Sequence, residues 1–150
     1  MNTVTIMRGP SGSGKSTHTK KIINALTVVV SSDLYFMKEG EYCFDPLQLP
    51  QAHNQCFIDF LCAIREEVEN IVVDNTNTRH WEYMKYVEVA KMNDYEVRIV
   101  EFMPITIADI KVCIERNTHN VPPEVIAKMC IEFEPCYSEN YVDVHGISER

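Results

Sequence analysis

Short runs of apolar residues recur along the chain, and longer segments with a helical period separate them. The runs at residues 4–7, 27–30 and 71–73 are rich in valine and isoleucine, and residues 95–102 alternate before they end in an apolar stretch. Runs of this length and composition are typical of strands that are covered on both faces in a parallel sheet. The pattern therefore predicts four buried strands.

The segments between these runs have the spacing of amphipathic helices. Apolar residues recur every three or four positions, and polar residues occupy the opposite face. The pattern predicts helices at residues 15–26, 51–69, 81–87, 107–116 and 122–133. Residues 33–50 and 117–121 are predicted to be loops, and the residues from 135 onward have no clear pattern.

Strands that alternate with helices predict an α/β fold. The sheet of such a fold is mostly parallel and carries helices on both faces. We therefore expect a three-layer sandwich with a mostly parallel sheet and a small helical lid. No segment of linker composition divides the chain, so we expect a single domain over residues 1–150 with a tail from about residue 135.

Composition narrows the class of protein. Apolar residues make up 45% of the 150 residues and charged residues 24%, which is close to the globular average and argues against a disordered or fibrous chain. The formal net charge is −8. This charge argues against a protein that coats duplex nucleic acid with its whole surface.

The sequence carries no sign of export or of membrane insertion. No apolar run reaches the ~20 residues that span a bilayer, and the first residues lack a basic segment followed by an apolar core. The six cysteines contain no C-x-x-C pair and no zinc-type spacing. We expect a cytoplasmic protein with reduced, buried thiols and no membrane contact, and the sequence leaves the oligomeric state open.

The segment GPSGSGKS at residues 9–16 fits the pattern G-x-x-x-x-G-K-[ST] without a gap, between a predicted strand and a predicted helix. Glycines let such a loop wrap a phosphate closely, with backbone N–H groups and the positive end of the helix directed at the anion. We expect Lys15 to reach the β- and γ-phosphates and Ser16 to hold Mg²⁺. The predicted nucleotide-binding residues are Gly9, Pro10, Ser11, Gly12, Ser13, Gly14, Lys15, Ser16 and Thr17. This loop serves kinases, ATPases and GTPases alike, so it does not define the reaction.

Two acidic residues follow predicted strands. Asp33 comes shortly after residues 27–30, and Asp74 comes directly after residues 71–73. Ligands of parallel α/β sheets lie beyond the carboxyl ends of the strands, so we assign Asp33 as the general base and Asp74 to the Mg²⁺ side. The sequence does not decide between these roles and their exchange, and either residue also suits a helix cap or a turn.

Further polar residues are candidates for substrate contacts. Asn75 and Asn77 lie in a short polar segment after a strand, where substrate contact and turn formation are equally good interpretations. Arg116 ends a predicted helix and is the candidate catalytic cation of a lid, and His119 follows it in the loop. The alternative is that Arg116 complements the helix dipole and His119 is solvated. Arg8 and Arg79 also flank the region of the site.

Taken together, these segments resemble P-loop kinases of the polynucleotide-kinase type, a family that includes phage enzymes. The resemblance extends over about residues 4–133. Beyond the phosphate loop it rests on SDLYF at residues 32–36, VDNTN at residues 73–77, and RN at residues 116–117 followed by VP at residues 121–122.

The resemblance implies ATP and Mg²⁺ as cofactors and a hydroxyl group as the phosphate acceptor. It assigns Asp33 as the catalytic aspartate, Lys15 and Ser16 as the phosphate and metal residues, and Arg116 as the lid arginine. This chain departs from the phage pattern at Phe36, where the phage enzyme has an arginine that helps to hold the acceptor, and its lid is less basic.

The acceptor is therefore open at this stage. We expect a kinase for the 5′-hydroxyl of a polynucleotide. Alternative acceptors are a nucleoside, a small metabolite or a modified base in DNA. A further alternative is that the domain binds a nucleotide without catalysing a reaction. Tyr35, Phe36 and Tyr42 are candidates to stack on a base or to fill the core. The tail, with Tyr137, Tyr141 and Val144, is predicted to dock on this domain or on a partner.

Overall fold

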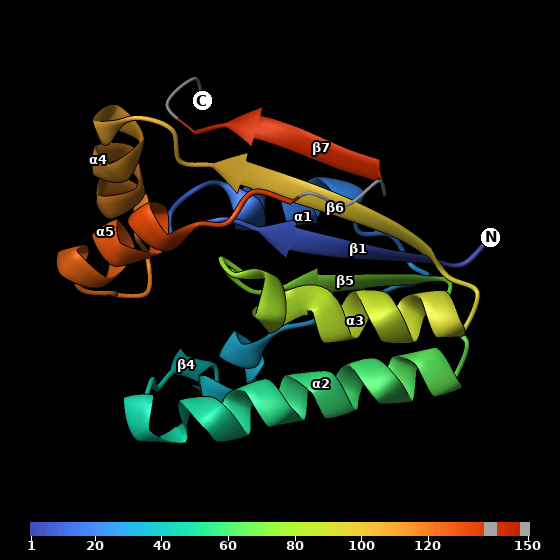
Figure 1. Cartoon of the computed structure of the whole chain (residues 1–150). Helices are drawn as coiled ribbons and strands as arrows, with labels where there is room; N and C mark the ends of the chain where they lie inside the picture. Colours follow the sequence, from blue (N-terminus) through green and yellow to red (C-terminus); the bar gives the residue numbers. More distant parts are fainter. Residues whose placement is uncertain (137–140, 148–150) are drawn as a thin grey trace.

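A parallel sheet forms the centre of the molecule (Figure 1). The computed structural model describes residues 1–136 and 141–147, and within them the sheet has five strands in the order β2–β5–β1–β6–β7. Each neighbouring pair is parallel. The strands are β1 Thr3–Arg8, β2 Thr27–Val30, β5 Asn70–Asp74, β6 Glu96–Met103 and β7 Tyr141–Gly146.

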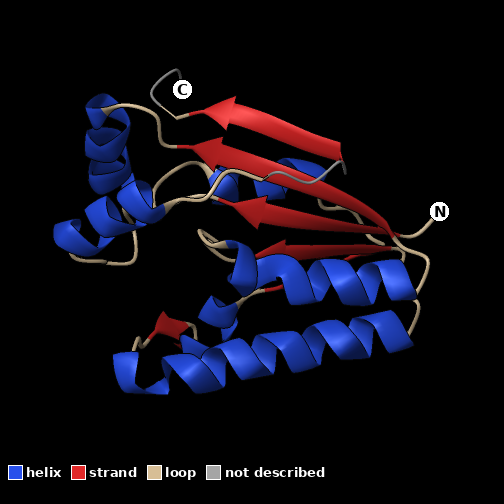
Figure 2. Ribbon diagram, viewed as in Figure 1, coloured by secondary structure: helices blue, strands red, loops and turns tan. Residues whose placement is uncertain are grey.

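Helices connect most of the strands (Figure 2). They are α1 Lys15–Ile22, α2 Leu49–Arg65, α3 His80–Met92, α4 Ile107–Arg116 and α5 Pro123–Glu132. The connection from β2 to α2 also holds the short 3-10 helices η1 Ser32–Phe36 and η2 Pro46–Gln48, and the hairpin of β3 Met37–Lys38 and β4 Glu41–Tyr42. Among the described residues, no helix combines the length and the apolar character that crossing a membrane requires.

The sheet separates two apolar cores. Val4 and Ile6 of β1 pack into the core that α2 and α3 cover, whereas Met7 and Val72 belong to the core on the other face. This division follows from the strand geometry, since successive side chains point to opposite faces. Figure 1 shows α1 behind the sheet, opposite α2 and α3, and shows α4 and α5 at the end toward which the strand arrows point. The α/β sandwich expected from the sequence is confirmed.

Four helices have bounds other than the predicted ones. Helix α3 continues to Met92 instead of ending at residue 87, helix α5 is shorter by one residue at each end, helix α2 begins two residues early, and α1 and α2 both end before the predicted residue. Helix α1 ends at Ile22, because the Asn24 side chain then accepts hydrogen bonds from Leu26 N–H (2.8 Å) and the Thr27 hydroxyl (3.0 Å) and forms a turn. Helix α2 ends at Arg65, because Glu67 adopts a positive φ of 56° that cannot continue a helix.

The tail contains a strand that the sequence pattern did not reveal. Strand β7 pairs with β6 from Arg98↔Tyr141 to Met103↔Gly146, so this part of the tail docks on the sheet of its own domain. Val142 packs against the core on the α2–α3 face, and Ile147 is fully buried in the other core. Tyr137 lies outside the described residues.

The prediction of buried thiols is correct for half of the cysteines. Cys56, Cys113 and Cys130 are buried, whereas Cys43 and Cys62 are exposed and Cys136 is half-buried. Cys62 is exposed because it lies on the solvent side of α2, next to the exposed Leu61.

A buried arginine joins several segments at the carboxyl ends of the strands. Arg8, at the end of β1, is fully buried and forms an ion pair with Glu101 of β6. Its guanidinium also donates to the backbone carbonyls of Asn77 (2.8 Å), Thr78 (3.1 Å) and Glu134 (2.6 Å). Arg8 is therefore a structural residue and does not belong to the pocket that the sequence suggested it flanks.

Aromatic rings enclose this guanidinium. The carbon at its centre lies 4.3 Å from the ring centroid of Tyr83 and 4.7 Å from that of Phe133. The Arg8–Glu101 pair is thus shielded from water, and a buried charge of this kind is stable only while its partners are in place.

Replacing Glu101 by Gln should lower the free energy of unfolding by about 3–5 kcal/mol, because Arg8 is then buried without its carboxylate. Urea unfolding followed by circular dichroism measures this loss. Glu96→Gln is the matched control on the same strand, since Glu96 pairs with Arg98 at 3.6 Å where both side chains are half-exposed, and its loss should stay below about 1 kcal/mol. Equal losses for the two variants would contradict the role of the buried pair.

Candidate functional site

The loop between β1 and α1 turns on glycines with positive φ. The angle is +79° at Gly12 and +110° at Gly14, a range that other residues rarely adopt. A Cβ atom at Gly12 would lie 2.1 Å from the carbonyl oxygen of Cys113 in α4, so the bare backbone of the loop touches that helix. Helix α1 begins at Lys15, and its first N–H groups point out toward the loop.

The backbone of residues 9–13, the first part of the loop, forms hydrogen bonds within the protein. The Gly9 N–H donates to the carbonyl of Thr76 (2.9 Å), and the Ser13 N–H donates to the carbonyl of Pro10 (3.1 Å). Ser13 is buried, and among the described residues its hydroxyl has no hydrogen-bond partner. Four predicted nucleotide-binding residues therefore lie outside the lining of the cavity: Gly9, Pro10, Ser11 and Ser13.

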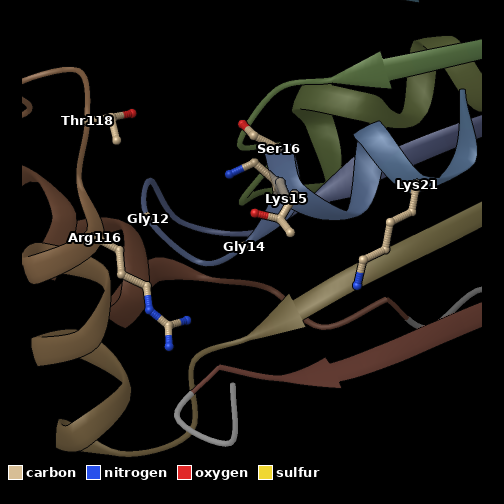
Figure 3. Close-up of a pocket in the computed structure, with 8 residues that line it drawn as sticks. Gly12, Gly14, Lys15, Ser16, Lys21, Arg116 and Thr118 are labelled. Atoms are coloured by element: carbon tan, nitrogen blue, oxygen red, sulfur yellow. The ribbon is translucent and has the colours of Figure 1, made fainter.

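A cavity of about 480 Å³ lies between the second part of this loop and the end of α4 (Figure 3). Three cationic side chains border it: Lys15 and Lys21 from α1, and Arg116 from α4. Converging cations and the positive end of a helix suit a ligand with several negative charges. The lining residues are Gly12, Gly14, Lys15, Ser16, Thr17, Lys21, Arg116 and Thr118.

Lys15 is the cation at the centre of the site. Its ammonium group donates to the carbonyls of Gly9 (2.8 Å) and Pro10 (3.0 Å), which directs the side chain back across the loop. Burial lowers the pKa of Lys15, and the carboxylates of Asp74 and Asp33 act in the opposite direction. Both aspartates, from the ends of two strands, therefore favour the charged form of Lys15.

Asp74 ends β5 and faces α1. One of its carboxylate oxygens accepts a hydrogen bond from the Thr19 hydroxyl at 3.4 Å. Burial raises the pKa of Asp74, and Lys15 and the Thr19 hydrogen bond act against this rise. The exposed Ser16 hydroxyl and this carboxylate are oxygen ligands of the kind that Mg²⁺ prefers, so the residues present fit a magnesium ion.

Asp33 lies in the first turn of η1, and its carboxylate is half-exposed. The backbone N–H of Asp33 donates to the Ser31 hydroxyl at 3.2 Å, which caps η1 and orients the residue. One carboxylate oxygen accepts a hydrogen bond from the Tyr42 hydroxyl (3.1 Å), and the other lies 3.6 Å from Nδ1 of His119. The structure thus brings two predicted site residues, Asp33 and His119, together.

Tyr42 also belongs to this cluster; the sequence offered it as a residue that stacks on a base or fills the core, but gave no sign of its contact with Asp33. Its ring stacks on His119, with centroids 4.4 Å apart and planes 22° apart. The pKa of Tyr42 is raised by burial and by the adjacent Asp33 charge, so the hydroxyl keeps its proton and donates it to the carboxylate. The hairpin β3–β4 and the loop after α4 therefore meet at Asp33.

The two asparagines after β5 make contacts within the fold. Asn75 is buried, and its carbonyl oxygen accepts hydrogen bonds from the backbone N–H (2.8 Å) and the hydroxyl (3.0 Å) of Ser32. Asn77 is buried with a φ of +46°, and its side chain donates to the carbonyl of Met7 at 2.9 Å. This geometry favours the turn-forming interpretation, and substrate contact by either residue stays a prediction.

The remaining candidates divide between core and surface. Phe36 is buried and packs edge-on against Tyr35, with ring centroids 5.3 Å apart, so Phe36 is a core residue and Tyr35 is half-buried beside it. Arg79 forms an ion pair with Glu132 of α5 at 3.4 Å and does not line the cavity. Lys21 and Thr118 do line it, but no sequence signal separates Lys21 from the neighbouring Lys20.

The fold and the site define a P-loop kinase-like domain. The phosphate loop follows the central strand β1. Asp74 is the last residue of β5, which lies next to β1, and Asp33 comes shortly after β2, the next strand in the sheet. The chain belongs to a family whose profile is described as AAA domain, and the match covers residues 4–135.

Individual relatives agree with this class. NEDD4-binding protein 2 of Homo sapiens is 32% identical over 153 residues, a match that covers 97% of this chain but only 8% of that protein. A chain of the Pnkp1/Rnl/Hen1 RNA repair complex has a TM-score of 0.67 at 18% identity, over 87% of this chain and 43% of its own. A gluconokinase from Sinorhizobium meliloti 1021 has a TM-score of 0.59 at 16% identity, over 98% of this chain and 83% of its own. At these identities, the two structural likenesses are likenesses of fold.

Replacing Gly12 by Ala should destabilise the protein more than replacing Gly40 by Ala. Both glycines have similar positive φ angles, +79° and +83°, but a Cβ at Gly40 meets no atom within 4 Å. We expect a loss of about 1–2 kcal/mol at Gly40 from the backbone alone, and about 1–3 kcal/mol more at Gly12 from the overlap with α4. Urea unfolding of both variants gives the difference, and equal losses would contradict the close contact between the loop and α4.

Proposed function

We propose that this domain is an ATP-dependent kinase that transfers the γ-phosphate to a hydroxyl group, foremost the 5′-hydroxyl of a polynucleotide. The observation that carries the proposal is that the phosphate loop, with Lys15 folded across it, lies at the same edge of the sheet as Asp74 and Asp33, whose carboxylates act on the charge of Lys15. Nucleotide binding alone requires the lysine of the phosphate loop but neither carboxylate. The two carboxylates supply what transfer to a hydroxyl needs in addition, a proton acceptor and a partner for a metal ion.

Asp33 suits the role of general base. Its carboxylate is half-exposed, so an acceptor hydroxyl has access to it, and the Tyr42 hydroxyl holds one of its oxygens in place. In the proposed step the acceptor oxygen bonds to the γ-phosphorus as its proton passes to Asp33. The bond from the γ-phosphorus to the bridging oxygen breaks, and ADP leaves.

The remaining residues stabilise charge. Lys15 and the N–H groups at the start of α1 bind the phosphates, and Arg116 approaches from the other side of the cavity. Magnesium held by Ser16 and Asp74 would neutralise part of the charge on the phosphate oxygens. His119, beside Asp33, closes the site on the side of the loop after α4.

A polynucleotide end is the preferred acceptor for two reasons. The stacked rings of Tyr42 and His119 form an aromatic surface next to Asp33, and nucleobases stack on such surfaces irrespective of sequence. The fold is also similar to that of a protein in an RNA repair complex and to that of a fungal RNA kinase, the latter with a TM-score of 0.65 at 11% identity over 97% of this chain and 38% of its own.

A second candidate is a kinase for a small hydroxyl compound, such as a nucleoside, a metabolite or a modified base in DNA. The net charge of −8 opposes long contacts with a phosphate backbone. In addition, the buried Phe36 stands where the phage enzymes carry an acceptor-binding arginine. The similarity of fold to a gluconokinase is consistent with this alternative.

A panel of acceptors separates these candidates. The full chain is incubated with Mg²⁺ and ATP labelled on its γ-phosphate, and with DNA and RNA oligonucleotides that carry a 5′-hydroxyl, the same oligonucleotides with a 5′-phosphate, nucleosides and sugars. Label transferred only to the 5′-hydroxyl ends supports the first candidate, and label on small compounds alone supports the second. ATP binding without transfer to any acceptor would contradict both and leave a binding module.

Asp33→Asn should lower kcat by roughly 10²–10⁴-fold and leave the Kd for ATP unchanged, because the variant loses the proton acceptor but keeps the phosphate loop. Lys15→Ala should weaken ATP binding itself. Steady-state kinetics and calorimetry measure the two effects. Asp59→Asn is the matched control, since Asp59 lies exposed on α2. An unchanged kcat in Asp33→Asn would remove Asp33 from the mechanism.

A further inference from the structure

A cluster of metal-ligand side chains lies on the α1 face of the sheet, apart from the phosphate cavity. It consists of His18 from α1 and of Asp143 and His145 from β7. One potential ligand atom from each residue lies within 4.8 Å of the other two, and all three residues are half-buried. The cluster uses the strand that the sequence pattern did not reveal, and nothing in the proposed reaction requires it.

The backbone brings these residues together for a simple reason. Asp143 and His145 are two positions apart in a strand and therefore share a face of the sheet. His145 pairs in register with Phe102 of β6, and the two rings stack with centroids 5.0 Å apart and planes 14° apart. His18 reaches the same spot from the helix that covers this face, with its ring centroid 5.0 Å from that of His145 and 5.8 Å from that of Phe102.

We propose that His18, Asp143 and His145 bind a divalent transition-metal ion such as Zn²⁺. Two imidazoles and one carboxylate are the donor set that zinc and its neighbours favour, whereas Mg²⁺ and Ca²⁺ prefer oxygen ligands. Three protein ligands leave a coordination position for water.

The present distances are compatible with such an ion. Nε2 of His145 lies 2.8 Å from a carboxylate oxygen of Asp143. Zinc–ligand bonds of about 2.0–2.2 Å put the ligand atoms of a tetrahedral site roughly 3.3 Å apart. The His145–Asp143 separation is slightly shorter than this value, and no pair of ligand atoms in the cluster is more than 4.8 Å apart, so the three side chains are already near the spacing that an ion requires.

The surroundings give the ion access and do not oppose its charge strongly. A groove of about 440 Å³ runs past His18 and Asp143. Arg98 lines the same groove, but its side chain forms an ion pair with Glu96 at 3.6 Å. Thr19, the next residue along α1, instead binds Asp74 on the phosphate side. The groove and the phosphate cavity share no lining residue, so the inferred metal site and the phosphate site are separate although both use α1.

Bound metal would fasten the edge strand β7 to α1. Within residues 1–136 and 141–147, β7 pairs with one strand of the sheet, β6. An ion with ligands on both elements links the last strand to the helix that carries Lys15 and Ser16. Its binding free energy then adds to the stability of the folded state.

Cobalt absorption tests the proposal directly. Metal-free, untagged full-length protein is titrated with Co²⁺ alone, and we expect one equivalent to give the visible bands of a four- or five-coordinate ion. These bands should persist in excess Mg²⁺, because imidazole ligands discriminate against it. The exposed thiols of Cys43 and Cys62 are the competing ligands, and an intense thiolate-to-cobalt band in the ultraviolet would identify them and overturn the proposal.

Variants of the ligands provide the second test. His18→Gln, His145→Gln and Asp143→Asn should each weaken Co²⁺ binding at least ~10-fold, since even indirect partners of a metal contribute that much. His53→Gln is the matched control, because His53 is also half-buried but lies on α2. Its affinity should equal that of the parent chain. Affinities unaffected by all three ligand substitutions, or no Co²⁺ binding at a large excess, would contradict the site.

Thermal unfolding gives an independent measurement. Zn²⁺ at 100 times its Kd should raise the Tm of the parent chain by about 5–10 °C and should leave the Tm of the ligand variants unchanged. The metal-free Tm of each variant shows whether it is folded, and the three substitutions are separate, so one unstable variant does not remove the test. A Zn²⁺ effect that persists in folded ligand variants would overturn the assignment.

Discussion

The guanidinium of Arg8 lies where four segments meet at the carboxyl edge of the sheet. Its contacts reach Glu101 of β6, the backbone of residues 77–78 after β5, and the backbone of Glu134 after α5. The same edge supplies the phosphate loop and Asp74. A buried charge demands all of its partners at once, because each missing contact leaves an unsolvated group. The contacts of Arg8 therefore hold the carboxyl ends of β1, β5 and β6 in fixed relative positions next to the site.

Local patterns predicted most of the fold and the outline of the site. The four apolar runs became four strands, and the phosphate loop has the glycine conformations that its spacing implied. Asp33 and Asp74 were identified because parallel strands end at one edge, an argument that needs only strand order along the chain. The positions of these candidate residues could therefore be predicted from short segments of sequence, while their roles stay predictions.

The sequence patterns did not predict contacts between segments that are far apart in the chain. Strand β7 is missed because polar residues, Asp143 and His145, alternate with its two valines, and this short pattern also occurs in loops. Tyr42 and His119 come from separate connections that have no common periodicity, yet their rings stack beside Asp33. Arg8 was a candidate for the pocket because the sequence does not show the carbonyl groups that surround it in the fold.

Helix α1 has only eight residues, but they contact several different parts of the molecule. Lys15 and Ser16 open it at the phosphate cavity, Thr19 contacts Asp74, and His18 packs against Phe102. A helix this short has little stability of its own. The loop before it and the sheet beneath it hold α1 in place, so a change in either one would shift the helix.

The contact of Gly12 with Cys113 has a mechanical consequence. A methyl group at Gly12 would overlap the carbonyl of Cys113, so the backbones of α4 and the phosphate loop are in direct contact, and α4 has no room to move toward the loop unless the loop moves too. Arg116 stands at the end of that same helix. A displacement of α4 toward the loop would therefore shift both Arg116 and the backbone N–H groups of the phosphate loop.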